Sequence, residues 1–332
     1  MHERRIPEWL CHAPAPSVRG FAVLAGTEAI ARGILISVFP LIIYRALQDV
    51  GVVSKVYFFI GLSSLMIGLL VPYLIRYVPR RWVYAAGTIM FAIGALLACF
   101  EAPTAVVVGL SFTTFATVTT FVCFSAYVLD YVSKIELGKL ETSRLFYSAL
   151  GWTVGPALGV FLYSWWRPAP FLIAASAALT MLLVFLVMRL GDGKLITKSR
   201  AAPANPFAYF RRFAEQPRLI TGWTFAVIRS CGWWVYVVYL PIYALENGLG
   251  EQLGGIALSI SNGALFLTPL MFRFIQRKSV KKAVRVGFLI SGLLFLVAGA
   301  PHGTPPIAVV CLMAGSFFLI LLDVCAGLPF LL

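Results

Sequence analysis

Apolar residues run along this chain in long blocks that are separated by short polar segments. A helix needs about 20 mainly apolar residues to cross the hydrocarbon core of a bilayer. Ten blocks are predicted to be membrane-spanning helices, at residues 21–44, 55–75, 82–100, 104–129, 145–165, 170–189, 219–244, 254–275, 284–300 and 306–332. The pattern therefore predicts an all-α polytopic membrane protein.

Composition agrees with this interpretation, because 60% of the 332 residues are hydrophobic and only 12% are charged. A water-soluble domain of this length could not bury so much apolar surface. The formal net charge is +14, but the cations lie in short connections between apolar blocks. This placement indicates orientation in a bilayer rather than binding to nucleic acid.

The distribution of lysine and arginine predicts the orientation of the helices. With the N-terminus inside, most of the 27 Lys and Arg residues fall in inner connections, and the outer segments hold only Arg45, Lys55 and Arg167. Such an excess marks the cytoplasmic side of a membrane protein. We expect an integral protein of the plasma membrane, the inner membrane of a bacterium, with a cytoplasmic N-terminus.

Two short basic turns indicate an internal duplication. One follows the second apolar block and the other follows the eighth. Their outer cations recur at a constant offset of 201 positions: Arg76 and Arg277, Arg80 and Lys281, Arg81 and Lys282. Repeats of the same orientation imply two halves related by an axis along the membrane normal.

This duplication divides the chain into three regions. Residues 1–190 form an N-terminal half of six helices, residues 191–218 a cytoplasmic central loop, and residues 219–332 a C-terminal half with four helices. Equivalent halves would each hold six helices, so we expect the chain to lack about two. In the loop, Asn205-Pro206 followed by phenylalanines at helical spacing predicts a short amphipathic helix at the membrane interface, with a plain linker as the alternative.

The two-half plan and two local motifs resemble the major facilitator superfamily. Its signature after the second helix, G-x-L-x-D-R-x-G-R-R, corresponds here to residues 72–81. Leu74, Arg80 and Arg81 match, whereas prolines replace both glycines and Arg76 stands in place of the acid. In the family that acid helps to close the cytoplasmic gate, a role that Arg76 cannot play. The resemblance still makes Arg76, Arg80 and Arg81 the candidate gating residues of this turn.

The second motif lies in the fifth predicted helix. The run Gly151-Trp-Thr-Val-Gly155-Pro156-Ala-Leu-Gly159 resembles the G-x-x-x-G-P-x-x-G core of exporters and antiporters in this superfamily. Small residues four apart allow helices to approach closely, and proline adds a bend. The resemblance implies a conformational role, and an ordinary close-packed helix is the alternative.

Four ionisable residues lie well inside predicted spans and are the main functional candidates: Glu28, Arg32, Arg229 and Asp323. Glu28 and Arg32 are four apart and can pair on one helix face. By the offset of 201, Glu28 corresponds to Arg229. The resemblance places all four on helices that line a central cavity. They would bind substrate and carry a coupling proton, or they would form ion pairs that hold the two halves together.

Two further residues are candidates for the substrate pathway. Asn262 could donate a hydrogen bond to substrate or join neighbouring helices. Trp233 could stack on a substrate or serve as a packing and interface residue.

The predicted function is secondary active transport of a small organic solute by alternating access, with proton-linked efflux favoured. An uptake permease for a sugar, organic acid or peptide is one alternative, and a non-transporting receptor or scaffold is another. The chain holds no ATP-binding G-x-x-x-x-G-K-[ST] loop. We therefore expect that an ion gradient, of protons, drives transport and that no cofactor is needed. We also expect no enzymatic activity, no metal site and a monomer.

Overall fold

The computed structural model describes residues 18–131, 137–188, 213–300 and 304–326, and these segments are helical apart from short turns. The all-α prediction is confirmed. Seven helices are long and apolar enough to cross a membrane by length and composition. The other three predicted spans are also helical, but they are more charged, less apolar or interrupted. The predicted amphipathic helix of the central loop begins at residues that lie outside the described segments.

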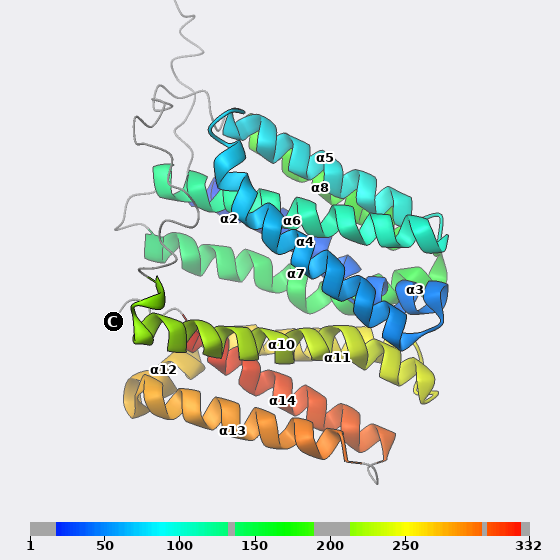
Figure 1. Ribbon diagram of the computed structural model, residues 1–332, viewed down its shortest axis with the longest axis vertical. Coiled ribbons are helices and arrows are strands. Elements are labelled where there is room, and N and C mark those ends of the chain that lie inside the picture. The colour runs from blue at the N-terminus through cyan, green and yellow to red at the C-terminus, as the bar shows by residue number, and fades with distance from the viewer. Residues whose placement is uncertain (1–17, 132–136, 189–212, 301–303, 327–332) are drawn as a thin grey trace, which may run out of the picture.

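The described helices pack as two bundles, one above the other in Figure 1. The N-terminal bundle consists of α2 (Val18–Leu35), α3 (Val38–Leu47), α4 (Val50–Leu74), α5 (Arg80–Ala98), α6 (Pro103–Tyr131), α7 (Leu137–Trp165) and α8 (Ala169–Val187). The C-terminal bundle consists of α10 (Pro217–Glu246), α11 (Gln252–Gly263), α12 (Thr268–Lys278), α13 (Val280–Ala298) and α14 (Pro305–Ala326).

Two predicted spans differ from continuous helices. The first is divided into α2 and α3 by a turn at residues 36–37. The eighth is divided by a short 3₁₀ segment, η1 (Ala264–Leu267), between α11 and α12. α12 begins Thr268-Pro269, and a proline has no backbone N–H to donate to the preceding turn, so the regular helix is interrupted there.

Both basic turns lie at the same end of the protein. The first joins α4 to α5, and the second joins α12 to α13 at Ser279. We call this the basic end; in Figure 1 it is the left-hand end, where α12 meets α13. Their common placement agrees with the duplication inferred from the offset of 201 positions.

The hydrophobic cores show how the two bundles meet. At the basic end each bundle has its own core, around Tyr84 and Phe185 in one and around Met271 and Ile275 in the other. Toward the opposite end, Ile242 of α10 joins a core that otherwise consists mainly of N-terminal residues. The bundles are therefore fused by apolar packing at the opposite end and have separate cores at the basic end.

Candidate functional site

The site is built on an unusually close contact between α2 and α7. A Cβ atom added to Gly155 would lie 2.6 Å from the carbonyl carbon of Gly33, and one added to Gly151 would lie 2.7 Å from that of Ala29. Only glycine permits this approach of two backbones. The G-x-x-x-G-P-x-x-G run therefore packs α7 directly against α2, as its small residues predict.

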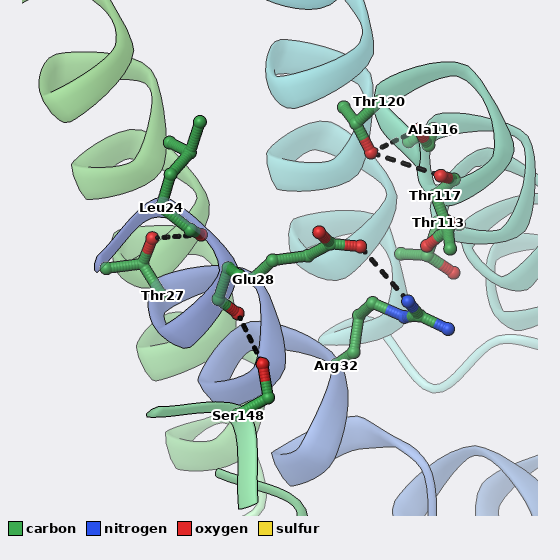
Figure 2. A network of polar contacts seen from close by, with 10 residues as sticks. Leu24, Thr27, Glu28, Arg32, Thr113, Ala116, Thr117, Thr120 and Ser148 are labelled. Carbon is green, nitrogen blue, oxygen red and sulfur yellow. Dashed lines mark hydrogen bonds and ion pairs between the residues drawn. The ribbon is translucent and has the colours of Figure 1, made fainter. Parts of the chain in front are cut away.

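This contact places the first charged pair. Arg32 donates a hydrogen bond to Glu28 over 3.0 Å, as the spacing of four residues predicts. The Arg32 guanidinium also lies over the ring of Trp152 on α7, 5.1 Å from its centroid. Figure 2 shows both side chains extending from α2 toward the threonine-bearing stretch of α6.

The second charged pair lies in the C-terminal bundle. Arg229 of α10 pairs with Asp323 of α14 over 2.9 Å, and Trp233 lies 6.0 Å from the guanidinium. Arg229 is largely buried, whereas half of the Asp323 side chain is exposed. Each ion pair therefore forms within one bundle, so these charges do not tie the two halves together in this structure.

A cavity of about 220 Å³ is lined by residues of both bundles. Glu28 and Arg32 line it from α2, Trp152 from α7, Leu265 from η1 and Asp323 from α14. Phe121 and Phe124 of α6 add aromatic walls, and Arg144 and Ser148 of α7 add polar ones. The sequence singled out three of these residues, Glu28, Arg32 and Asp323.

The other predicted pathway residues do not line this cavity. Trp233 packs beside Arg229 and Tyr236. Asn262 of α11 is buried, with 3% of its surface exposed. Among the described residues no cluster of three His, Cys, Asp or Glu side chains could hold a metal ion.

Polar contacts between the bundles gather at the end opposite the basic turns. Arg45 of α3 pairs with Glu251 beside α11, and the hydroxyl of Tyr44 donates to Glu246 over 2.8 Å. Deeper in, the backbone N–H of Ala157 donates to the hydroxyl of Ser259 over 2.9 Å. Together with the shared apolar core, these contacts close the protein on this side of the cavity.

A larger hollow of about 700 Å³ lies at the end opposite the basic turns. Arg45 and Glu251 form part of its wall, together with a second ion pair, Arg167 to Glu101, at 2.9 Å. Apart from Glu251, every residue that lines this hollow belongs to the N-terminal bundle.

The three predicted gating residues at the basic end differ in their surroundings. The Arg80 guanidinium stacks over Tyr127, 4.9 Å from the ring centroid, and Arg81 lies over Trp82 at 5.7 Å. Arg76 is exposed and has no ion pair with any residue that the structure describes. Their role in gating stays a prediction.

The model of one protein family, described as the Major Facilitator Superfamily, matches residues 21–329. The chain belongs to the Major Facilitator Superfamily. It is a membrane transporter rather than an enzyme. In the ten-helix numbering of the sequence prediction, α2–α3 form helix one, α7 is helix five, and α11, η1 and α12 together form helix eight.

Solved transporter structures share this Major Facilitator fold. A mutant of the nucleoside transporter NupG superposes with a TM-score of 0.75 at 15% identity, over 94% of this chain and 81% of that one. NupG itself gives 0.68 at 16% identity, over 94% and 80%. A D-xylose-proton symporter gives 0.62 at 13% identity, over 91% and 78%. No curated protein is matched by sequence.

Sequence reasoning missed the residues that close this transporter at the end opposite the basic turns. From the sequence, Arg45 indicates only the orientation of the helices and Glu251 is not a candidate, because each lies at the edge of an apolar block. In the sequence, Trp152 is only an unspecified position of the glycine motif, although the Arg32 guanidinium lies over its ring. A weak signal was available, since opposite charges bordering different helices on the same side of a membrane can pair.

Proposed function

We propose that this protein is a secondary transporter that carries a small organic solute through the cavity between its bundles by alternating access. One observation carries the proposal. The cavity is lined by charged residues of both bundles, and among the residues that the structure describes the shared core and the ion pair between the bundles lie on the side away from the basic turns. Rocking about this site would open the closed side and close the other.

The positive-inside rule gives the proposed orientation. The basic end faces the cytoplasm, so this structure corresponds to the conformation closed toward the outside. In the outward-open conformation, the Arg45–Glu251 contact separates, and the hollow of about 700 Å³ becomes the outer entrance to the site. The proposed setting is a monomer in the bacterial inner membrane.

Two carboxylates are suited to proton coupling. Glu28 and Asp323 both line the cavity, and each is paired with an arginine of its own bundle. Protonation of either carboxylate would release its arginine, so proton binding would change the charge that a solute meets. The α7 motif favours proton-linked efflux, and gradient-driven uptake is the alternative direction.

The printed names of the similar structures suggest the first solutes to test. NupG is a nucleoside transporter, and the third structure is a D-xylose-proton symporter. Both names denote uncharged, hydrogen-bonding molecules. We propose a polar organic solute of this kind, whose movement is coupled to protons.

The test is solute flux in proteoliposomes with an imposed pH gradient. Radiolabelled uridine and D-xylose are supplied as neutral probes, and benzoate and tetraphenylphosphonium as charged ones. The proposal expects flux of at least one probe with wild type, and loss of gradient dependence in Glu28→Gln or Asp323→Asn. If liposomes containing the protein carry every probe at the rate of empty liposomes, the proposal is wrong.

A further inference from the structure

One face of α11 lies against α7 along the contact between the bundles. Gly255, Ser259 and Gly263 follow each other at four-residue spacing, so they share this face. A Cβ added to Gly255 would lie 2.6 Å from the carbonyl oxygen of Pro156, and Ser259 accepts the hydrogen bond from Ala157.

Asn262 belongs to the same face, because it lies seven residues after Gly255 and three after Ser259. The position that a Cβ on Gly263 would take is 3.8 Å from the methyl group of Thr153 on α7. Thr153 and Asn262 therefore lie on facing surfaces, one contributed by each bundle.

This part of the contact borders the transport cavity. Trp152, the neighbour of Thr153, lines the cavity, and so does Leu265 in the 3₁₀ segment that begins two residues after Asn262. Irregular helical segments inside a membrane occur where they line cavities. Thr153 and Asn262 thus lie directly beyond the cavity wall, on the side toward the Arg45–Glu251 closure.

Both residues carry a buried polar atom without a hydrogen-bond partner. The Nδ2 atom of Asn262 and the Oγ1 atom of Thr153 have none among the residues that the structure describes. Asn262 is 97% buried, with 3% of its surface exposed. Leaving such groups unpaired away from water costs free energy, so buried polar groups that remain unpaired are rare.

The neighbouring polar residues show that the fold can satisfy such groups here. Tyr236 and Ser261 share a hydrogen bond of 2.7 Å, and Ser316 donates to Ser261 over 2.9 Å. Asn262, adjacent to Ser261 in the chain, takes no part in this network. The amide nitrogen of Asn262 therefore stays unpaired beside a polar network whose hydroxyls are satisfied.

We propose that Thr153 and Asn262 form a hydrogen-bonding subsite for the transported solute, with one group on each bundle. The inference rests on the transport function proposed above. The amide of Asn262 donates to an oxygen of the solute, and the Thr153 hydroxyl donates or accepts. When α7 and α11 separate at the outer end, both groups face the solute that enters from that side.

The chemistry of the site specifies an uncharged solute with closely spaced hydroxyl or carbonyl oxygens. The cavity carboxylates Glu28 and Asp323 are already neutralised by Arg32 and Arg229. Arg144, the other cation on the cavity wall, also has an interaction within the protein. The charged groups of the wall are thus engaged, whereas the unpaired amide and hydroxyl match neutral polar groups. The ring of Trp152, at the cavity wall beside Thr153, offers an apolar face to such a molecule.

Two substitutions remove the polar atoms and nearly keep the shape: Thr153→Val and Asn262→Leu. Each is expected to raise the KM for uridine or D-xylose about tenfold in proteoliposomes, equivalent to about 1.4 kcal/mol for a lost hydrogen bond. In the solute-free protein, each is expected to raise Tm by about 2–4 °C, because an unpaired polar group is replaced by an apolar one. Thr153→Ser keeps the hydroxyl and should stay near wild type in KM.

The outcomes separate this subsite from the wider function. A raised KM together with a raised Tm supports it. Unchanged KM values in both variants, or flux of the charged probes alone, overturns the subsite but leaves the transport function standing. A lowered Tm in both solute-free variants shows that the two groups are paired within the protein, which also overturns it. No flux of any probe by wild type contradicts the transport function and the subsite together.

Discussion

The close contact between α2 and α7 predicts that Gly155→Ala destabilises the protein. The new Cβ would lie 2.6 Å from the carbonyl carbon of Gly33, whereas ordinary contacts begin at 3.4 Å. The atom that it meets belongs to the backbone, so no side chain can rotate away. The two helices must move apart by about 0.8 Å, and overpacking of this kind typically costs about 1–3 kcal/mol.

The predicted result is a lower Tm and a weaker flux. A cost of about 1–3 kcal/mol corresponds to a fall in Tm of about 2–10 °C. Flux should fall as well, because Arg32, the neighbour of Gly33, moves with α2 relative to Trp152. Tm is measured in detergent from the monodisperse fraction that survives heating, and flux is measured in proteoliposomes.

Gly61→Ala is the matched control for this experiment. Gly61 lies in α4, and a Cβ added there would meet nothing within 4 Å. Alanine is the better helix former by about 0.8–1.0 kcal/mol, so Tm should stay level or rise slightly. Equal Tm values for Gly155→Ala and Gly61→Ala would refute the backbone contact between α2 and α7.

Three further predictions concern polar contacts. Arg45→Glu alone places two carboxylates together and should slow flux, whereas adding Glu251→Arg should restore it. Tm should change little, because a partly exposed ion pair contributes only about 0–1 kcal/mol. Failure of the double substitution to restore flux would contradict the pairing. Ser37→Ala removes a buried hydrogen bond of 2.7 Å to a carbonyl of α7 and should lower the stability by about 1 kcal/mol. Its Tm should lie below that of Ser64→Ala, where the hydroxyl is exposed, and equal Tm values would contradict this bond. Arg229→Leu leaves the carboxylate of Asp323 without its cation and should abolish flux, whereas Arg229→Lys should retain part of it. Wild-type flux in Arg229→Leu would exclude a role for this ion pair in transport.

Most of the fold could be predicted because the bilayer imposes simple rules on the chain. Helix length follows from membrane thickness, and the orientation prediction follows from where lysine and arginine occur. The equivalence of the two basic turns was visible as a constant offset, and both turns lie at one end of the structure. The interruptions at residues 36–37 and at η1 were missed, because long apolar blocks were read as continuous helices.

The candidate site was predictable in its residues but not in its pairing. Glu28 and Asp323 stood out because charges within a span are costly. By the offset of 201, Glu28 corresponds to Arg229, and ion pairs between the halves are one of the two expectations from the sequence. In the structure, each carboxylate pairs with an arginine of its own bundle. Such partners depend on how helices far apart in sequence are placed, as in the pairing of Arg45 with Glu251, 206 positions later.

The central claim is that flux requires the Arg45–Glu251 contact to open. The direct test is reversible cross-linking of Arg45→Cys to Glu251→Cys, in a protein whose six native cysteines are replaced by serine. A short bis-methanethiosulfonate linker is added to proteoliposomes, and flux is measured before and after reduction. The matched control cross-links Glu101→Cys to Arg167→Cys, an ion pair at the same end but within one bundle.

The account predicts that the linker between Arg45→Cys and Glu251→Cys stops flux, that reduction restores it, and that the control linker leaves flux unchanged. Undiminished flux through protein held closed between these two positions would contradict the account.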